Sequence, residues 1–189
     1  MTANKLAIYA ANPAGFCDST RAWLRDTLLP KLSDPLFEIL NPWEAVMGLS
    51  SSQIRESSKT MALETAMGMG KTNAESIERC DVVFAVLDGT DVDSGVAAEI
   101  GYAVAKGKMV IGVRTDYRLA SEVPACTVNL QVEYFIKQSG GLIHDNLGDA
   151  IMNLHLLAVE KTGTFLTLEA AGALIRGDTP ERKPVVKKS

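Results

Sequence analysis

The sequence predicts an α/β fold in which parallel strands form one sheet with helices on both of its faces. Short apolar runs, such as KLAIYAA at 5–11 and DVVFAVL at 81–87, have the continuous hydrophobicity of strands that are buried on both sides. Each run is followed by a segment with helical periodicity, and repeated β-then-α units are typical of a parallel sheet. The 189 residues, of which 47% are hydrophobic, can bury a sizeable core but are few for two domains.

The expected elements alternate along the chain. We expect strands at 5–11, 37–43, 81–87, 109–113 and the start of 142–161, and helices at 17–32, 95–106, the rest of 142–161 and 165–175. The N-cap of the first helix should be Asp18 or Ser19, and Pro42 should stop the second strand. Gly107 should cap the carboxyl end of the helix at 95–106.

Two segments lack a clear pattern. Residues 47–72 are rich in Ser and Met, only partly helical in pattern and longer than a usual connection, so we expect a flexible flap there, followed by a helical turn at 73–80. The basic end, 177–189, has no apolar periodicity and is expected to be disordered. The prediction is therefore one domain over residues 1–176 with a disordered tail.

Composition excludes several classes of function. A net charge of -4 and a pI near 5.2 disfavour nucleic-acid binding, and no apolar run approaches the roughly 18 residues of a membrane span. The three cysteines, Cys17, Cys80 and Cys126, are odd in number and widely spaced, without a CxxC motif or a signal peptide. These features predict a protein of the reducing cytoplasm.

Motifs for cofactors and metals are weak. GMGKT at 68–72 resembles part of a phosphate-binding loop, but Thr65 stands where that motif needs glycine. The loop after the first strand lacks G-x-G-x-x-G, and His144 and His155 have no carboxylate-rich partners nearby in sequence. We therefore expect no cofactor and no metal.

The most informative stretch is DGTDVDSGVAAEIGY at 88–102, which puts four carboxylates at a strand-to-helix junction. Ligands of open α/β sheets bind beyond the carboxyl ends of the strands, where this junction falls. Glu99 stands among apolar residues near the helix start, where desolvation and the helix N-terminus together favour a poorly hydrated anion able to act as a nucleophile. The alternative is that Glu99 caps loop amides or pairs with Arg79 or Arg114.

The stretch 80–116, CDVVFAVLDGTDVDSGVAAEIGYAVAKGKMVIGVRTD, resembles the core of the nucleoside 2-deoxyribosyltransferase family, in which an Asp stands six residues before a Glu that opens an E-[LIV]-G-x-A helix. Here these are Asp93 and Glu99. LAIYAANPAGF near the amino terminus is similar to the family's first strand and loop, with Tyr9 as the tyrosine that bonds the glutamate. VNLQ at 128–131 resembles the segment whose Asn, here Asn129, reaches a neighbouring subunit's sugar.

The resemblance covers roughly residues 5–158 and implies a flavodoxin-like, doubly wound, five-stranded parallel sheet of order 2-1-3-4-5 in a homo-oligomer (dimer-based, tetramer or hexamer). It also implies that Phe16 and Gly95 bind substrate. Where the family often has an Asp, eight residues before the third strand's Asp81, this chain has Asn73. A neutral amide can hold a base but cannot protonate it. The resemblance therefore leaves Asp93 as the proton donor and implies that Asn73 and Asp81 bind the substrate.

The implied reaction is metal-independent exchange of purine or pyrimidine bases on 2'-deoxynucleosides through a 2-deoxyribosyl ester of Glu99, in nucleoside salvage. One alternative is a deoxynucleoside or deoxynucleotide N-glycosidase that uses the same Glu99. The Ser-rich segment at 47–72 includes Arg55 and so contains the kinds of side chain that bind a 5'-phosphate. The sequence therefore does not decide between nucleoside and nucleotide substrates. The other alternative is a nucleotide-sensing module without catalysis.

Overall fold

The computed structural model describes residues 5–163 and has five parallel strands in the order β2-β1-β3-β4-β5. The strands are β1 Leu6–Ala11, β2 Phe37–Leu40, β3 Val82–Val86, β4 Met109–Val113 and β5 Ile143–His144. This confirms the flavodoxin-like fold class and the strand order. The expected helix at 165–175 and the tail at 177–189 lie outside the described residues.

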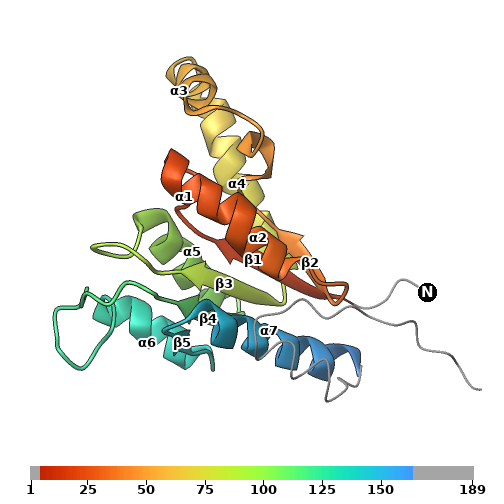
Figure 1. Ribbon diagram of the computed structural model, residues 1–189, viewed down its shortest axis with the longest axis vertical. Helices are drawn as coiled ribbons and strands as arrows, with labels where there is room; N and C mark the ends of the chain where they lie inside the picture. The colour runs from red at the N-terminus through yellow and green to blue at the C-terminus, as the bar shows by residue number, and fades with distance from the viewer. Residues whose placement is uncertain (1–4, 164–189) are drawn as a thin grey trace, which may run out of the picture.

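Helices cover both faces of the sheet and bury two apolar clusters (Figure 1). One cluster joins alternate strand residues such as Ile8 and Phe84 to the segment α1 Asp18–Trp23, η1 Leu24–Leu28 and α2 Leu29–Leu32, and to α7 Leu147–Thr162. The other joins Tyr9 and Val83 to α4 Leu63–Arg79, α5 Ser94–Ala105 and α6 Leu130–Gln138. Because successive strand residues face opposite ways, Tyr9 is directed to the α5 side of the sheet.

The first helical segment differs in detail from the prediction. Its N-cap is Cys17, so the expectation of Asp18 or Ser19 was wrong. Asp18 instead uses its carboxylate to bind Arg21 and Ser51. The middle of the segment is a π-helix, in which the Leu29 N–H bonds to the Leu24 carbonyl, directly before Pro30, whose missing N–H interrupts the α-helical pattern.

Regular helices also replace much of the expected flap. After η2 Glu44–Val46 the chain forms α3 Ser51–Lys59, which a capping box between Ser50 and Gln53 begins, and then the 17-residue α4. The predicted helical turn at 73–80 is the end of α4. Gly68 and Gly70 lower helix propensity and hide the start of this helix from pattern analysis. We call residues 51–72 the arm, because α3 and the first half of α4 project away from the sheet (Figure 1).

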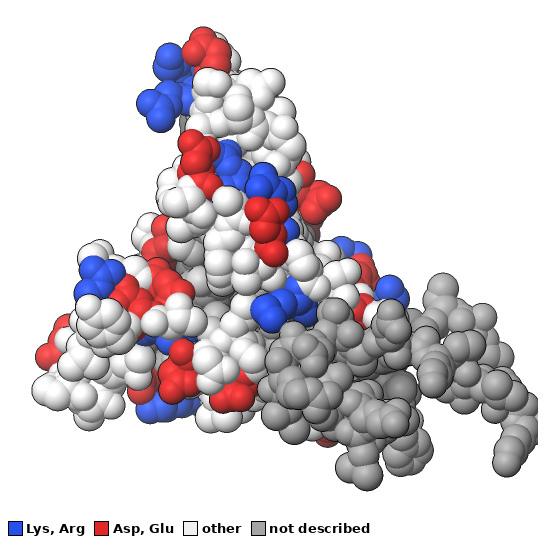
Figure 2. Space-filling model, viewed as in Figure 1, with Lys and Arg blue, Asp and Glu red and all other residues white. Residues whose placement is uncertain are grey.

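The arm has little contact with the core. None of the residues of α3 is buried, and α4 buries only Ile77, which lies beyond the arm. Charged groups gather at the end of the projection, above a largely uncharged surface (Figure 2). Within the arm, the apolar side chains of Leu63 and Met67 are exposed.

Candidate active site

The loop between β3 and α5 presents Asp93 as the N-cap of α5. Its Oδ1 accepts hydrogen bonds from the backbone N–H groups of Gly95 (2.9 Å) and Val96 (3.1 Å). These bonds satisfy two of the amides that a helix start leaves free, and so they determine where α5 begins. A Cβ at Gly95 would lie 3.0 Å from Asp93 Oδ1, so the missing side chain allows this close approach.

Glu99 lies in the second turn of α5 and meets donors from two other elements. Tyr9, 1% exposed on β1, donates its hydroxyl to Glu99 Oε1 at 2.6 Å, and Asn73 of α4 donates its amide to the same oxygen at 3.5 Å. Within residues 5–163 no donor bonds to Oε2. The structure therefore brings Tyr9 to Glu99, as the resemblance implied, places Asn73 against the same oxygen, and leaves the other carboxylate oxygen open.

Burial controls the protonation of this pair. Desolvation raises the pKa of Glu99, the hydrogen bond from Tyr9 lowers it, and Asp93 raises it when its own carboxyl group is ionised. The pKa of Tyr9 is raised well above its ordinary value, first by burial and then by the neighbouring Glu99 charge. Tyr9 therefore remains a protonated donor, and the pKa of Glu99 lies above its ordinary value on balance, because solvent stabilises the ionised carboxylate poorly.

The alternative partners proposed for Glu99 are engaged elsewhere. Arg79 pairs with Glu38 at 3.0 Å, and Arg114 donates only to backbone carbonyls among its described contacts. The start of α5 is capped by Asp93. The interpretation of Glu99 as a structural ion pair or cap is therefore wrong.

An aromatic pair stands beyond the carboxyl end of β1. Phe16 is 71% exposed and packs edge-on against Trp43 with ring centroids 4.6 Å apart. Trp43 donates its indole N–H to the Asn12 carbonyl at 2.8 Å and covers Gly15, where a Cβ would lie 2.0 Å from the ring. Sequence reasoning found Phe16 but not Trp43, which follows the second strand and gives no periodic signal.

Two other expected site residues have no described hydrogen bond to Glu99 and bond to other groups. Asp81 precedes β3, at the opposite end of that strand from the acidic loop, where it accepts from the Ala7 N–H at 2.7 Å and binds Lys161. Asn129 is the N-cap of α6, accepting from the N–H groups of Gln131 and Val132, and its amide bonds Glu122. Within its own chain Asn129 therefore caps a helix.

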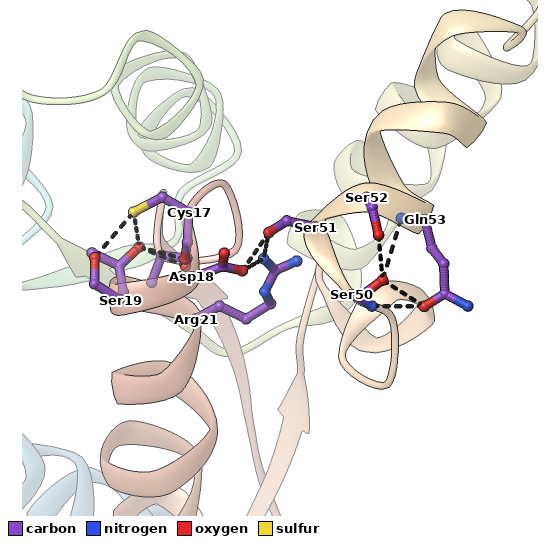
Figure 3. Close-up of polar contacts among 10 residues, drawn as sticks. Cys17, Asp18, Ser19, Arg21, Ser50, Ser51, Ser52 and Gln53 are labelled. Atoms are coloured by element: carbon purple, nitrogen blue, oxygen red, sulfur yellow. Dashed lines mark hydrogen bonds and ion pairs between the residues drawn. The ribbon is translucent and has the colours of Figure 1, made fainter.

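A polar cluster that the sequence did not predict joins the arm to α1. The Arg21 side chain is 7% exposed and donates to Asp18 at 2.5 Å and to Ser51, and Ser51 also bonds Asp18 (Figure 3). We call these three residues the latch. Next to it, hydrogen bonds from Ser19 and Thr20 lower the pKa of the exposed Cys17 thiol to about 7.

Two classes of feature are absent from residues 5–163. No helix there is long and apolar enough to cross a membrane. No group of three or more His, Cys, Asp and Glu side chains in the same range could hold a metal ion.

The family model for nucleoside 2-deoxyribosyltransferase matches residues 8–163, which include Tyr9, Asn73, Asp93 and Glu99. The chain belongs to the nucleoside 2-deoxyribosyltransferase family. A relative from Schizosaccharomyces pombe, described as an uncharacterized protein, is 33% identical over 98 residues, which cover 49% of this chain and 46% of the relative. The match thus spans about half the length of that curated relative.

Two solved structures share the fold of this family member. A conserved protein from Enterococcus faecalis is 23% identical with a TM-score of 0.62, and the match covers 81% of this chain and 99% of that one. A 2-desoxiribosyltransferase from Leishmania mexicana is 21% identical with a TM-score of 0.55, and the match covers 78% and 95% of the two chains. At these identities the likeness concerns the fold.

Proposed function

We propose that this protein exchanges the purine or pyrimidine bases of 2'-deoxynucleosides through a covalent 2-deoxyribosyl ester on Glu99. The observation that carries the proposal is the carboxylate of Glu99, which is partly buried at the carboxyl edge of the sheet, has Tyr9 on one oxygen and has the other oxygen open. Such a carboxylate suits attack on a sugar carbon that develops positive charge.

In the first half-reaction Glu99 Oε2 bonds to C1' while the bond from C1' to the base nitrogen breaks. The electron pair of that bond goes to the base, which takes a proton from Asp93 acting as general acid. Both hydrogen bonds that Asp93 accepts reach Oδ1, so Oδ2 is the oxygen that would carry this proton. Phe16 would stack on the base, and the Gly95 backbone and Asn73 would line the site.

In the second half-reaction a ring nitrogen of the incoming base attacks C1' on the face that the ester leaves open. The bond from C1' to Glu99 breaks, its electron pair returns to the carboxylate, and the proton of the incoming base returns to Asp93. Two displacements at C1' give overall retention and ping-pong kinetics. Water in place of the second base would release 2-deoxyribose, so hydrolysis competes with transfer.

A homo-oligomer belongs to the same proposal. Asn129 begins α6, on which Leu130 and Tyr134 are exposed, and Tyr117 in the preceding connection is 95% exposed. We call these three apolar side chains, with Asn129, the rim. A second subunit on this rim would bury those groups and bring Asn129 to the neighbour's sugar. The described cysteines are free thiols, which suits a salvage enzyme of the reducing cytoplasm.

The second candidate is an N-glycosidase that acts on deoxynucleosides or deoxynucleotides with the same Glu99. It is favoured by the incomplete burial of Glu99 in the single chain, because water could then reach the ester. Arg55 and the serines at the start of α3 are the groups that a 5'-phosphate would use. A nucleotide-sensing module would bind the nucleoside and release no base.

One experiment separates the three functions. The protein is incubated with deoxyinosine, with and without free adenine, and the products are separated by chromatography. Deoxyadenosine that forms only with adenine indicates transfer, hypoxanthine with free deoxyribose indicates hydrolysis, and unchanged deoxyinosine indicates binding alone. A mass increase on the peptide that contains Glu99, trapped by acid quenching, tests the ester itself.

A further inference from the structure

A buried cation stands at the carboxyl end of β4 and has no role in the proposed reaction so far. Arg114 is 3% exposed, and its described hydrogen bonds all go to backbone carbonyls. Nη1 donates to Leu87 at 2.5 Å, and Nη2 donates to Gly89 at 3.0 Å and to Arg118 at 2.8 Å. Nε is buried without a partner in the described part of the chain. Burying a charge in this way is costly, so the contacts it makes need an explanation.

The three carbonyls belong to two loops that the proposed site depends on. Leu87 and Gly89 open the connection from β3 to Asp93, the N-cap of α5. Arg118 lies in the connection from β4 to Asn129, the N-cap of α6. One guanidinium therefore bonds to the backbone of both loops, because its planar fork can reach several acceptors at once.

The loops also bond in the reverse direction. The carboxylate of Asp88 accepts from the Thr115 N–H at 2.5 Å, from the Thr115 hydroxyl at 2.8 Å and from the Asp116 N–H at 2.8 Å. Gly89 has φ +135°, a conformation that side chains disfavour, and its carbonyl faces Arg114 in this arrangement. The loop from β3 to Asp93 is thus held both by the hydrogen bonds that Arg114 donates to its backbone and by those that its own Asp88 accepts.

We propose that Arg114 is a positioning residue, which holds the 88–93 loop so that Asp93 stands at a fixed distance from Glu99 and from the leaving base. This inference rests on the proposed function. Arg114 touches no reacting atom, and its effect passes through the backbone of Gly89 to Asp93. Proton transfer to the leaving base depends steeply on the donor's place, and a misplacement of about 1 Å can reduce the rate roughly a hundredfold.

The decisive variant is Arg114→Lys, which keeps the charge but cannot reach three carbonyls from one ammonium group. We expect kcat for base release to fall about ten- to a hundredfold, with KM within about threefold of wild type. Arg79→Met is the matched control, because it removes an exposed arginine that pairs with Glu38 and should leave kcat unchanged. All rates are measured well below the melting temperature of each variant and per folded protein.

Gly89→Ala tests the same contact from the other loop, and because Gly89 is not fully buried the variant should fold even if Arg114→Lys does not. We expect the same pattern, a lower kcat with little change in KM. A purely structural role for Arg114 would lower the melting temperature and leave kcat of the folded variants at the wild-type value. That result, or a raised KM with unchanged kcat, would overturn the proposal.

A second measurement does not require catalysis. If Arg114 holds the loop, hydrogen exchange at the Gly95 and Val96 amides, which bond Asp93, should be faster in Arg114→Lys and unchanged in Arg79→Met. A wild-type protein that releases no base from any deoxynucleoside would refute the proposed function, and the exchange result would still decide whether Arg114 positions Asp93. Unchanged protection of these two amides would refute the inference about Arg114.

Discussion

Two walls of the Glu99 site are built in opposite ways. On the β3–β4 side, five described hydrogen bonds tie adjacent loops together, of which Arg114 donates two and Asp88 accepts three. Arg114 is buried and donates once more within its own loop, to Arg118. On the other side, α4 brings Asn73 to Glu99, but its first half belongs to the arm, which has no buried residue in α3. The core therefore fixes Glu99 and Asp93, whereas the helix that carries Asn73 has only one buried residue, Ile77, to hold it in place.

The hydrogen bonds to Glu99 reflect this contrast. Tyr9 comes from a central strand and donates at 2.6 Å, whereas Asn73 comes from α4 and donates at 3.5 Å, the limit of a hydrogen bond. A buried strand residue cannot move without disturbing the sheet, and a helix that projects from the sheet can shift more easily. We therefore expect substitutions on the rigid side to change the rate of the chemical step most, and substitutions in the arm to change it least.

The largest effect should come from the rigid side, at Glu99 itself. Glu99→Ala removes the proposed nucleophile, and base exchange should fall by at least about three powers of ten. Glu75→Ala is a suitable control, because Glu75 is an exposed glutamate of α4 that pairs only with Lys71 among its described contacts. More than about a tenth of wild-type activity in Glu99→Ala would show that Glu99 is no nucleophile.

Tyr9→Phe tests the strong hydrogen bond without removing the ring from the core. We expect kcat to fall about ten- to a hundredfold with the fold intact, because a charge-assisted bond to Glu99 is lost. The pH profile should change as well. Tyr9 lowers the pKa of Glu99, so its loss raises that pKa, and activity should begin to fall at a higher pH on acidification.

The measurement is kcat against pH for both proteins, with circular dichroism as the check on folding. An unchanged rate and an unchanged acidic limb would remove Tyr9 from the site.

Asn129→Ala asks whether the second loop of the rigid wall serves a neighbouring subunit. The variant loses the cap of α6, which should cost about 1 kcal/mol of unfolding free energy in any case. If Asn129 also completes a neighbour's sugar site, deoxynucleoside binding should weaken and the ratio of hydrolysis to transfer should rise, because water reaches the ester more easily.

Deoxyribose release is compared with base exchange, and the oligomeric state is measured by light scattering. Asn146→Ala is the matched control, since Asn146 caps α7 in the same way and lies elsewhere. Lower stability with an unchanged product ratio, together with a fully active monomeric wild type, would disprove the shared site.

The rigid wall was also the more predictable part of the molecule. Strand runs at 81–87 and 109–113 show plainly in the sequence, and the resemblance of LAIYAANPAGF to the family's first strand and loop predicted the contact between Tyr9 and Glu99. Asp81 shows how strand direction limits such motifs. It precedes its strand, and ligands bind beyond the carboxyl ends, so that rule alone would have separated Asp81 from the site.

The arm was predictable only in part, for physical reasons. Gly68 and Gly70 weaken the helical pattern, and the arm has no buried stripe to produce a clear apolar period. The latch joins residues about thirty positions apart through short polar side chains, and nothing in local sequence indicates which Ser will meet Asp18. Arg114 escaped prediction similarly, because its partners are backbone carbonyls, which any residue provides.

The smallest effect on chemistry should come from the latch. Ser51→Ala removes the bonds from Ser51 to Asp18 and from Arg21 to Ser51 but leaves the ion pair between Arg21 and Asp18 within α1. The arm then loses its described polar tie to α1, so amides of α3 should exchange several-fold faster than in wild type. Because Tyr9 and Asp93 are held by other contacts, kcat should stay within about threefold of wild type, with the larger change in KM.

Ser52→Ala is the control, since Ser52 bonds only Ser50 among the described residues. Equal exchange in Ser51→Ala and Ser52→Ala would show that the latch does not hold the arm, and a kcat loss as large as that of Tyr9→Phe would show that the arm belongs to the rigid side of the site.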